Sequence, residues 1–264
     1  ETVFFDHIGQ PFQWNQSDEF PWAAMRDCID KNAPIILLTD LYYLDYYQTS
    51  THFSGHAIVL AGYDMEVDDG VAYVADTERP GLQLTSLASL AQAMVSEAFP
   101  TPVHNYWYPF SAVEIKDLKQ AIRKGLARAT KLMLEPKVEV MGLQAMRRWA
   151  QELALWPKVA SDWVWCARFG YQVIEKRGTG GGAFRLMYAE FLEEAQAYCP
   201  ELRAVDSVGE MREIAWCWRE LAKILYRASE EKDANLMKLA GDVAHSIVKA
   251  ETKFWQKLKE IFHN

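Results

Sequence analysis

The clearest pattern in the chain is an apolar stretch over residues 56–63 with the two-residue period of a β-strand. One face carries His56, Ile58, Leu60 and Gly62. The opposite face is also largely apolar, which predicts a strand in the middle of a sheet. The acidic segment 64–70 ends in Asp-Gly, a turn signal, so residues 71–76 are predicted to pair back as a hairpin. This return places Asp76 beside His56.

Other apolar runs predict the neighbours of this hairpin. Residues 34–40 predict a buried strand, and an amphipathic helix over residues 18–32 leads directly into it. Ser86 is expected to cap a short helix that ends at about Ala98. Residues 1–17 show no regular pattern, so no element is predicted there.

The pattern changes after a proline-rich stretch. Three prolines within residues 100–109 indicate a linker and place a domain boundary near Asn105. After residue 111, apolar positions recur with the period of an α-helix. Helices are expected over 112–134, 142–155, 163–177, 183–199, 207–228 and 231–261. The sequence therefore predicts an α+β part with an antiparallel sheet over residues 1–104 and an all-α helical domain over residues 105–264.

Composition narrows the classes of function. The chain has 264 residues, of which 50% are hydrophobic and 24% charged, as expected of a globular protein with one large or two modest cores. A net charge of -8 argues against a general nucleic-acid-binding role and is compatible with cationic ligands. No apolar run approaches the ~20 residues that span a bilayer, so we expect no membrane association.

The spacing of cysteines and histidines predicts no metal site. The four cysteines are Cys28, Cys166, Cys199 and Cys217, and none forms a Cys-x-x-Cys pair. Reduced thiols in a cytoplasmic protein are therefore the default expectation. His52 and His56 share an i, i+4 spacing, but this spacing presents two ligands on one face only in a helix, and a strand is predicted here.

His56 and Asp76 are the first candidates for chemistry. A carboxylate that accepts a hydrogen bond from one imidazole nitrogen fixes the tautomer in which the other nitrogen acts as a base. This is the base and orienting acid of a Cys-His-Asp or Ser-His-Asp site. The alternative is a packed histidine in a strand and an aspartate that starts the turn of residues 77–81.

An aromatic segment follows the strand predicted over residues 34–40. Tyr42, Tyr43, Tyr46 and Tyr47 offer flat apolar surface with a polar tip, which suits the wall of a substrate cleft. His52, in the loop before His56, is a further candidate for substrate binding. The alternative is that these tyrosines pack against the helical domain, although at least one of them is expected to face the site.

A glycine-rich run separates two of the predicted helices. It consists of Gly178, Thr179, Gly180, Gly181 and Gly182, and Arg185 follows one turn later. Backbone amides at the start of a helix can hold an anion, and the phosphate of phosphopantetheine is a candidate ligand. The run is neither a Walker loop nor a dinucleotide fingerprint. The alternative is a tight turn whose glycines let two helices pack closely.

Two stretches resemble a known pair of domains. Residues 34–64 and 74–81 resemble the N-terminal domain of butirosin biosynthesis protein H, and residues 171–195 resemble the helical domain of unknown function that follows it. The resemblance implies a papain-like, cysteine-dependent fold that works as an acyltransferase in antibiotic biosynthesis. Such an enzyme moves an acyl group from an acyl carrier protein to an amine of an aminoglycoside. By this resemblance His56 is the general base and Asp76 its orienting acid.

The chain departs from that family in one respect. The family's nucleophilic cysteine lies near the domain's N-terminus, at the start of a helix whose dipole favours the thiolate. Here no cysteine precedes Cys28, which lies in the helix predicted over 18–32. We therefore expect the nucleophile to precede Glu1. A peptidase or amidohydrolase of the same fold, and a binding relative without a nucleophile, are the alternatives.

The resemblance also implies partners: an acyl carrier protein that brings its phosphopantetheine arm, a small-molecule amine, and no tightly bound cofactor. The predicted helix 112–134 gathers its cations on one half, namely Lys116, Lys119, Arg123, Lys124, Arg128 and Lys131. This face is a candidate docking surface for the acidic carrier, with an ordinary solvated face as the alternative. Residues 175–177 are expected to pair locally or across a homo-oligomer.

Overall fold

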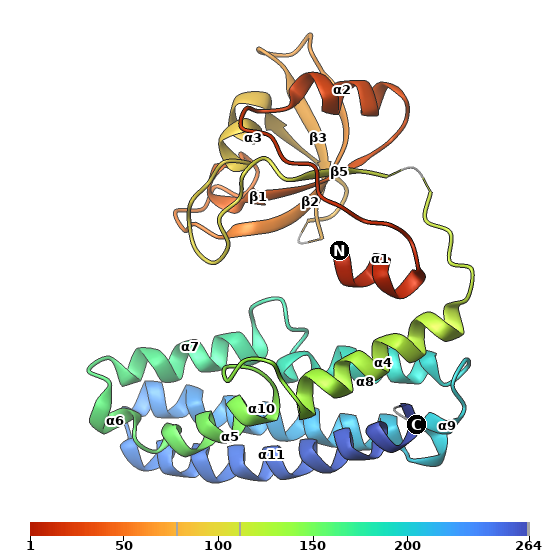
Figure 1. Cartoon of the computed structure of the whole chain (residues 1–264). Coiled ribbons are helices and arrows are strands. Elements are labelled where there is room, and N and C mark those ends of the chain that lie inside the picture. The colour runs from red at the N-terminus through yellow and green to blue at the C-terminus, as the bar shows by residue number, and fades with distance from the viewer. Residues whose placement is uncertain (78, 111, 263–264) are drawn as a thin grey trace. The chain divides into compact units, whose positions relative to one another are not determined.

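The computed structural model describes residues 1–77, 79–110 and 112–262, which form two compact units (Figure 1). Unit 1 comprises Glu1–Asp6 and Gln10–Ile115, and unit 2 comprises His7–Gly9 and Lys116–Asn264. The units divide after Ile115, beyond the boundary expected near Asn105. The reason is a short strand, β5 (Trp107–Pro109), which pairs with the sheet of unit 1 inside the stretch that the prolines marked as a linker.

Unit 1 is built on an antiparallel five-stranded sheet with the order β4-β3-β2-β1-β5. The other strands are β1 (Ile35–Asp40), β2 (Ser54–Asp64), β3 (Val71–Ala75) and β4 (Leu82–Ser86). The prediction of a central strand in the middle of a sheet is confirmed, since β2 lies between β1 and β3. The predicted hairpin is confirmed as well, with Asp69 and Gly70 at positive φ in its turn.

One face of β2 differs from the prediction. The pairing of β2 with β3 shifts between Leu60 and Gly62, so a β-bulge interrupts the strict alternation. As a result Gly62 pairs with Tyr73, and Tyr63 pairs with the buried Ala72. The expected face is therefore correct from His56 to Leu60 and wrong at Gly62, where the extra residue reverses the side.

Two helices and a 3₁₀ turn complete unit 1: α2 (Trp22–Asp30), η1 (Leu41–Tyr43) and α3 (Leu87–Ala93). Most of α1 (Thr2–Ile8) also belongs to it, up to Asp6. Helix α1 was not predicted, and the buried Phe5 near its middle stacks on Phe12 and meets the edge of Tyr108. The predicted cap of α3 is confirmed, because Ser86 Oγ accepts a hydrogen bond from the amide of Ser89. This helix ends at Ala93, earlier than expected.

The core of unit 1 lies on one face of the sheet. Alternate residues of the central strands are buried there, and α3 packs against them with Leu87, Leu90 and Ala93. The buried strand residues are Ile35, Leu37, Ile58, Leu60, Ala72 and Val74. His56 precedes Ile58 by two residues and Asp76 follows Val74 by two residues, so both side chains continue this face at its end.

Unit 2 is entirely helical, as predicted. Its helices are α4 (Leu118–Leu134), α5 (Gly142–Leu153), α6 (Trp156–Val159), α7 (Trp163–Glu175), α8 (Arg185–Ala195), α9 (Glu201–Ala204), α10 (Ser207–Glu231) and α11 (Ala234–Phe262). The long α10 and α11 contact each other along the bundle (Figure 1). The helix expected from residue 183 is split, because Ala183 and Phe184 have positive φ in the 3₁₀ turn η2 (Gly182–Phe184) that precedes α8.

A buried ion pair ties α8, α10 and α11 together. Glu251 is fully buried, and both of its carboxylate oxygens accept from Arg185, at 2.7 and 3.1 Å. The indole nitrogens of Trp218 and Trp255 donate to the same carboxylate. Four donors therefore satisfy a charge that would otherwise be costly to bury. Among the described residues, no helix is long and apolar enough to cross a membrane.

Candidate active site

The hairpin brings His56 and Asp76 into contact. His56 is the third residue of β2, Asp76 directly follows β3, and imidazole Nε2 lies 2.9 Å from carboxylate Oδ2. The side chain of Asp76 is 0% exposed and that of His56 is 13% exposed. A buried carboxylate next to an imidazole nitrogen acts as an acceptor, so Nε2 carries the hydrogen of this bond.

Tyr46 adds a second donor to the same oxygen. Its hydroxyl donates to Asp76 Oδ2 over 2.8 Å. Burial, and then the hydrogen bond to Asp76, raise the pKa of Tyr46 above its ordinary value of 10.0. Tyr46 therefore stays a neutral phenol and keeps donating, which holds the carboxylate in one orientation.

The second imidazole nitrogen of His56 is available. In the described part of the chain, Nδ1 of His56 has no hydrogen-bond partner. With the hydrogen on Nε2, Nδ1 carries a lone pair and can accept a proton from a nucleophile or a substrate. The backbone is also fixed, because Thr39 Oγ1 donates to the carbonyl of His56 from the neighbouring strand over 3.0 Å.

Two further residues lie at this site: Tyr47, which the sequence proposed as part of a cleft wall, and Arg79, which it did not single out. The ring of Tyr47 meets the His56 imidazole edge-on, with centroids 5.9 Å apart. The Arg79 guanidinium lies 4.8 Å from the centroid of the Tyr47 ring, and the Arg79 amide donates to the carbonyl of Asp76. The signal for Arg79 was the turn directly after Asp76, where the sequence Arg-Pro-Gly precedes β4.

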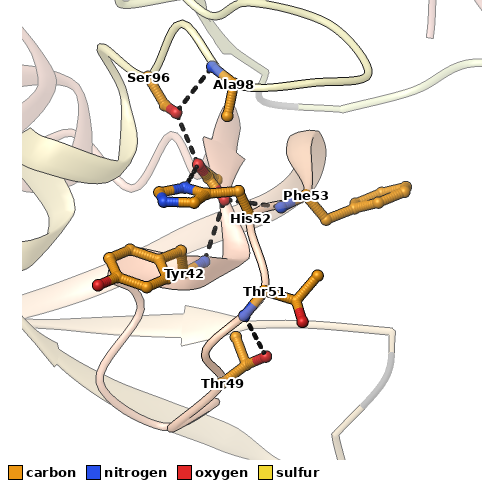
Figure 2. Close-up of polar contacts among 8 residues, drawn as sticks. Tyr42, Thr49, Thr51, His52, Phe53, Ser96 and Ala98 are labelled. Atoms are coloured by element: carbon orange, nitrogen blue, oxygen red, sulfur yellow. Dashed lines mark hydrogen bonds and ion pairs between the residues drawn. The ribbon is translucent and has the colours of Figure 1, made fainter.

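His52 takes part in a second histidine–aspartate pair. Its Nδ1 lies 2.7 Å from Oδ2 of Asp40, which is fully buried at the end of β1 (Figure 2). Tyr42 stacks on the His52 imidazole, with centroids 4.0 Å apart and ring planes within 22°, and Tyr43 meets it edge-on. The sequence proposed His52 as a substrate-binding residue but gave no sign of its carboxylate partner.

The four tyrosines thus divide between the two pairs. Tyr42 and Tyr43 contact His52, whereas Tyr46 and Tyr47 contact Asp76 and His56. All of these partners belong to unit 1. The expectation that these tyrosines bind a substrate stays a prediction.

Two family models match the chain. Residues 1–77 match the family described as butirosin biosynthesis protein H, N-terminal, and residues 88–258 match a domain of unknown function (DUF4872). No curated protein matches the chain. The chain belongs to the butirosin biosynthesis protein H family. Both histidine–aspartate pairs fall inside the first match, which also suggests a papain-like fold for this part.

In this family member, Cys28 does not lie beside His56. The amide of Ala33 donates to the carbonyl of Cys28, so α2 ends next to the start of β1. His56 pairs with Thr39, near the other end of β1, and four residues of strand separate the two places by about 13 Å. The position of the nucleophile stays a prediction.

The other thiols belong to unit 2. Burial raises the pKa of both the Cys166 and the Cys199 thiol, the opposite of what activates a nucleophile. Within residues 1–77, 79–110 and 112–262, no group of three or more His, Cys, Asp or Glu side chains could hold a metal ion.

At the glycine-rich turn, oxygen atoms of the chain itself accept hydrogen bonds from two of the glycine amides and from Arg185. The Gly182 amide donates to Glu175 Oε1, and the Gly181 amide to Thr179 Oγ1. All three guanidinium nitrogens of Arg185 donate to oxygens of Glu251 or Ala183. A phosphate site here stays a prediction, and these contacts favour the alternative of a close-packed turn. Of the pairings expected at residues 175–177, Glu175–Arg219 and Arg177–Gln172 are formed within the chain.

The basic face of α4 is also partly occupied. Arg123, a central member of the proposed docking surface, pairs with Glu201 and lies over the ring of Phe262. The helix begins at Leu118, with Asp117 as its cap, so Lys116 precedes it. A carrier-docking surface on this helix stays a prediction.

Proposed function

We propose that this protein transfers an acyl group from an acyl carrier protein thioester, through a cysteine thioester, to an amine of a small molecule. The observation that carries the proposal is the bond between His56 Nε2 and the buried Asp76, which leaves Nδ1 of His56 with a lone pair. The family match supports a role related to butirosin biosynthesis, and the acyl-transfer step is our inference from the pair.

In the first half of this reaction, His56 Nδ1 takes the proton of a cysteine thiol. The thiolate attacks the carrier thioester, a new C–S bond forms, and the carrier thiol leaves with a proton from His56. Asp76 offsets the charge of the transient imidazolium, and Tyr46 keeps the carboxylate in place. The thiol is part of the proposal, since the described residues around His56 supply none.

In the second half, a neutral amine attacks the acyl-cysteine. The C–N bond forms, the C–S bond breaks, and the proton that the amine loses passes through His56 to the leaving thiolate. His56 can serve both half-reactions, because each of them needs one proton to be taken up and released by its imidazole ring. The proposal differs from a hydrolase in the second nucleophile, which is an amine rather than water.

The test uses the complete protein, a butanoyl thioester of an acyl carrier protein and 1,4-diaminobutane. Mass spectrometry should show a butanoyl-cysteine adduct that the diamine resolves to an amide. His56→Ala should slow adduct formation by about 10² to 10⁴, the usual contribution of a general base. His104→Ala is the matched control, since His104 pairs with Glu97 on the surface of the same unit, and it should react like the wild type.

Two results would contradict the proposal. An adduct that forms at the wild-type rate in His56→Ala removes His56 from the chemistry. Cleavage of peptides without any adduct from the carrier thioester would identify a hydrolase instead.

A further inference from the structure

Asp40 gathers hydrogen bonds from three separate segments. Its Oδ1 accepts from the amides of Tyr42 and Phe53, at 3.1 and 2.9 Å, and its Oδ2 accepts from Ser96 Oγ and His52 Nδ1, at 2.6 and 2.7 Å. Figure 2 shows these side chains and amides converging on one carboxylate. Burial alone would raise the pKa of Asp40, but the four hydrogen bonds outweigh it and lower the pKa below 3.8. The buried group is therefore a carboxylate anion.

This anion determines how His52 faces its surroundings. Because Nδ1 donates to Asp40, the neutral imidazole presents the lone pair of Nε2. The side chain is 43% exposed, and in the described part of the chain Nε2 has no hydrogen-bond partner. Tyr42 stacks against the ring and limits its rotation. His52 is thus an oriented hydrogen-bond acceptor, and no described bond within the chain uses it.

The His52 ring lines a pocket of about 520 Å³ in unit 1. Gln92 and Glu97 also line it, and Glu97 adds a carboxylate, which pairs with His104 over 3.3 Å. Among its described lining residues there is no Lys or Arg. Acceptors on the wall, together with the buried Asp40 anion behind His52, favour a cationic hydrogen-bond donor.

We infer that this pocket is the subsite for the ammonium group of the acceptor amine, with His52 Nε2 as the group that binds it and takes its proton. The inference rests on the proposed acyl transfer, and it names the substrate class of that reaction as a primary amine. An alkylammonium ion cannot attack a thioester until it loses a proton, so a base beside the bound amine has a defined task.

The proton balance is simple. Nε2 accepts one proton from the ammonium ion, which leaves a neutral amine and an imidazolium whose charge Asp40 offsets through Nδ1. The neutral amine then attacks the acyl group, the C–N bond forms as the C–S bond breaks, and His56 passes the second proton to the leaving thiolate. The His52 imidazolium, whose side chain is 43% exposed, returns its proton to solvent. The two histidines lie four positions apart in the chain, a separation of at most about 14 Å. The amine that His52 deprotonates must then move to the thioester beside His56, and this length is the upper limit on the distance between the two Cα atoms.

The first experiment measures binding without any chemistry. 1,4-Diaminobutane is titrated into the protein while the His52 ring resonances are followed by NMR, and 1,4-butanediol serves as the uncharged comparison. The diamine should shift these resonances to saturation and the diol should not. His52→Asn keeps an amide donor near Nδ1 for Asp40 but loses the Nε2 acceptor, so the Kd for the diamine, followed by calorimetry, should rise at least tenfold.

Two further variants test whether the effect on binding is specific to the pocket. Glu97→Gln removes a carboxylate from the pocket without touching Asp40, and the Kd should rise about threefold. His104→Asn removes an imidazole of similar exposure outside the lining, so the Kd should stay the same or fall as Glu97 is released. Equal binding of diol and diamine, or an unchanged Kd in His52→Asn, overturns the inference.

Kinetics separate this inference from the proposed function. In single-turnover experiments with the butanoyl carrier, His52→Asn should form the acyl-cysteine within about twofold of the wild-type rate and resolve it with diamine at least tenfold more slowly. If the adduct forms and is resolved at the wild-type rate, the subsite is wrong although the acyl transfer stands. If no adduct forms in the wild type, the acyl transfer fails and the binding titration alone decides the subsite.

Discussion

Two histidine–aspartate pairs lie at the same end of strands β1 and β2, and they are built in opposite ways. His56 bonds its aspartate through Nε2 and presents Nδ1, whereas His52 bonds its aspartate through Nδ1 and presents Nε2. His56 is 13% exposed and His52 is 43% exposed. The pair in the sheet therefore suits a shielded reaction, and the pair in the loop suits a ligand that arrives from solvent.

The supports of the two pairs differ as well. Strand pairing positions His56, whereas Asp76 directly follows the paired strand β3 and accepts a further hydrogen bond from Tyr46. By contrast, Asp40 accepts from two backbone amides and thereby holds both ends of the loop over residues 41–53. Asp40 therefore contributes to the stability of its loop through backbone hydrogen bonds, whereas the backbone near Asp76 is held mainly by strand pairing. Substitutions at the two aspartates should separate activity from stability.

The largest effect is expected for Asp76→Asn. An amide at this position can donate to Nε2 of His56, which moves the hydrogen to Nδ1 and removes the base. Formation of the acyl-cysteine should slow by about 100-fold or more, measured as a single-turnover rate. Asp30→Asn is the control, because Asp30 accepts from Tyr63 on the surface of the same unit. A rate within threefold of the wild type would show that Asp76 does not set the tautomer.

The next effect is on stability. Asp40→Ala leaves two backbone amides, a serine hydroxyl and an imidazole without their acceptor, so the free energy of unfolding should fall by about 3 kcal/mol. Urea denaturation followed by circular dichroism measures it. Asp40→Asn keeps one oxygen for the amides of Tyr42 and Phe53 and should lose less.

The same variant has a pH dependence with a defined sign. The pKa of Asp40 is lowered in the folded state, so its stabilisation is complete above the ordinary value of 3.8 and is lost as the pH falls through the folded value. The stability difference between wild type and Asp40→Ala should be constant above about pH 5 and shrink below pH 3.8. A difference that grows on acidification would contradict an ionised Asp40.

The pair that the sequence predicts is the one whose contacts follow from local pairing. A two-residue period and an Asp-Gly turn are sufficient to place Asp76 beside His56. The bulge at Ala61 was hidden, because nothing in an apolar run marks an extra residue. It lies beyond His56, Ile58 and Leu60, so it did not disturb the predicted site.

The pair of His52 and Asp40 could not be predicted from the sequence, because its contacts depend on the tertiary fold. Ser96 and Asp40 are 56 positions apart, and their bond depends on where α3 ends and how the chain leaves it. The Phe53 amide, 13 positions along the chain, is a backbone donor that has no signature in the sequence, although an aspartate commonly accepts from the amide two residues later, as Asp40 does from Tyr42. Strand β5 was missed for a different reason. The prolines indicated a linker, but Pro109 lies at the end of an edge strand, where its missing N–H is not needed for strand pairing.

The smallest effect is expected for Tyr46→Phe, which removes the second donor to Asp76 and leaves the bond to His56 in place. A single hydrogen bond of this kind contributes about 1 kcal/mol, so acyl-cysteine formation should slow about fivefold. The KM for the carrier thioester should not change, because Tyr46 acts through Asp76. Tyr63→Phe, which removes a surface bond to Asp30, should leave the rate unaltered. If Tyr46→Phe slows the reaction as much as Asp76→Asn, the phenol itself touches the reacting atoms, and Tyr46 joins His56 as a catalytic group.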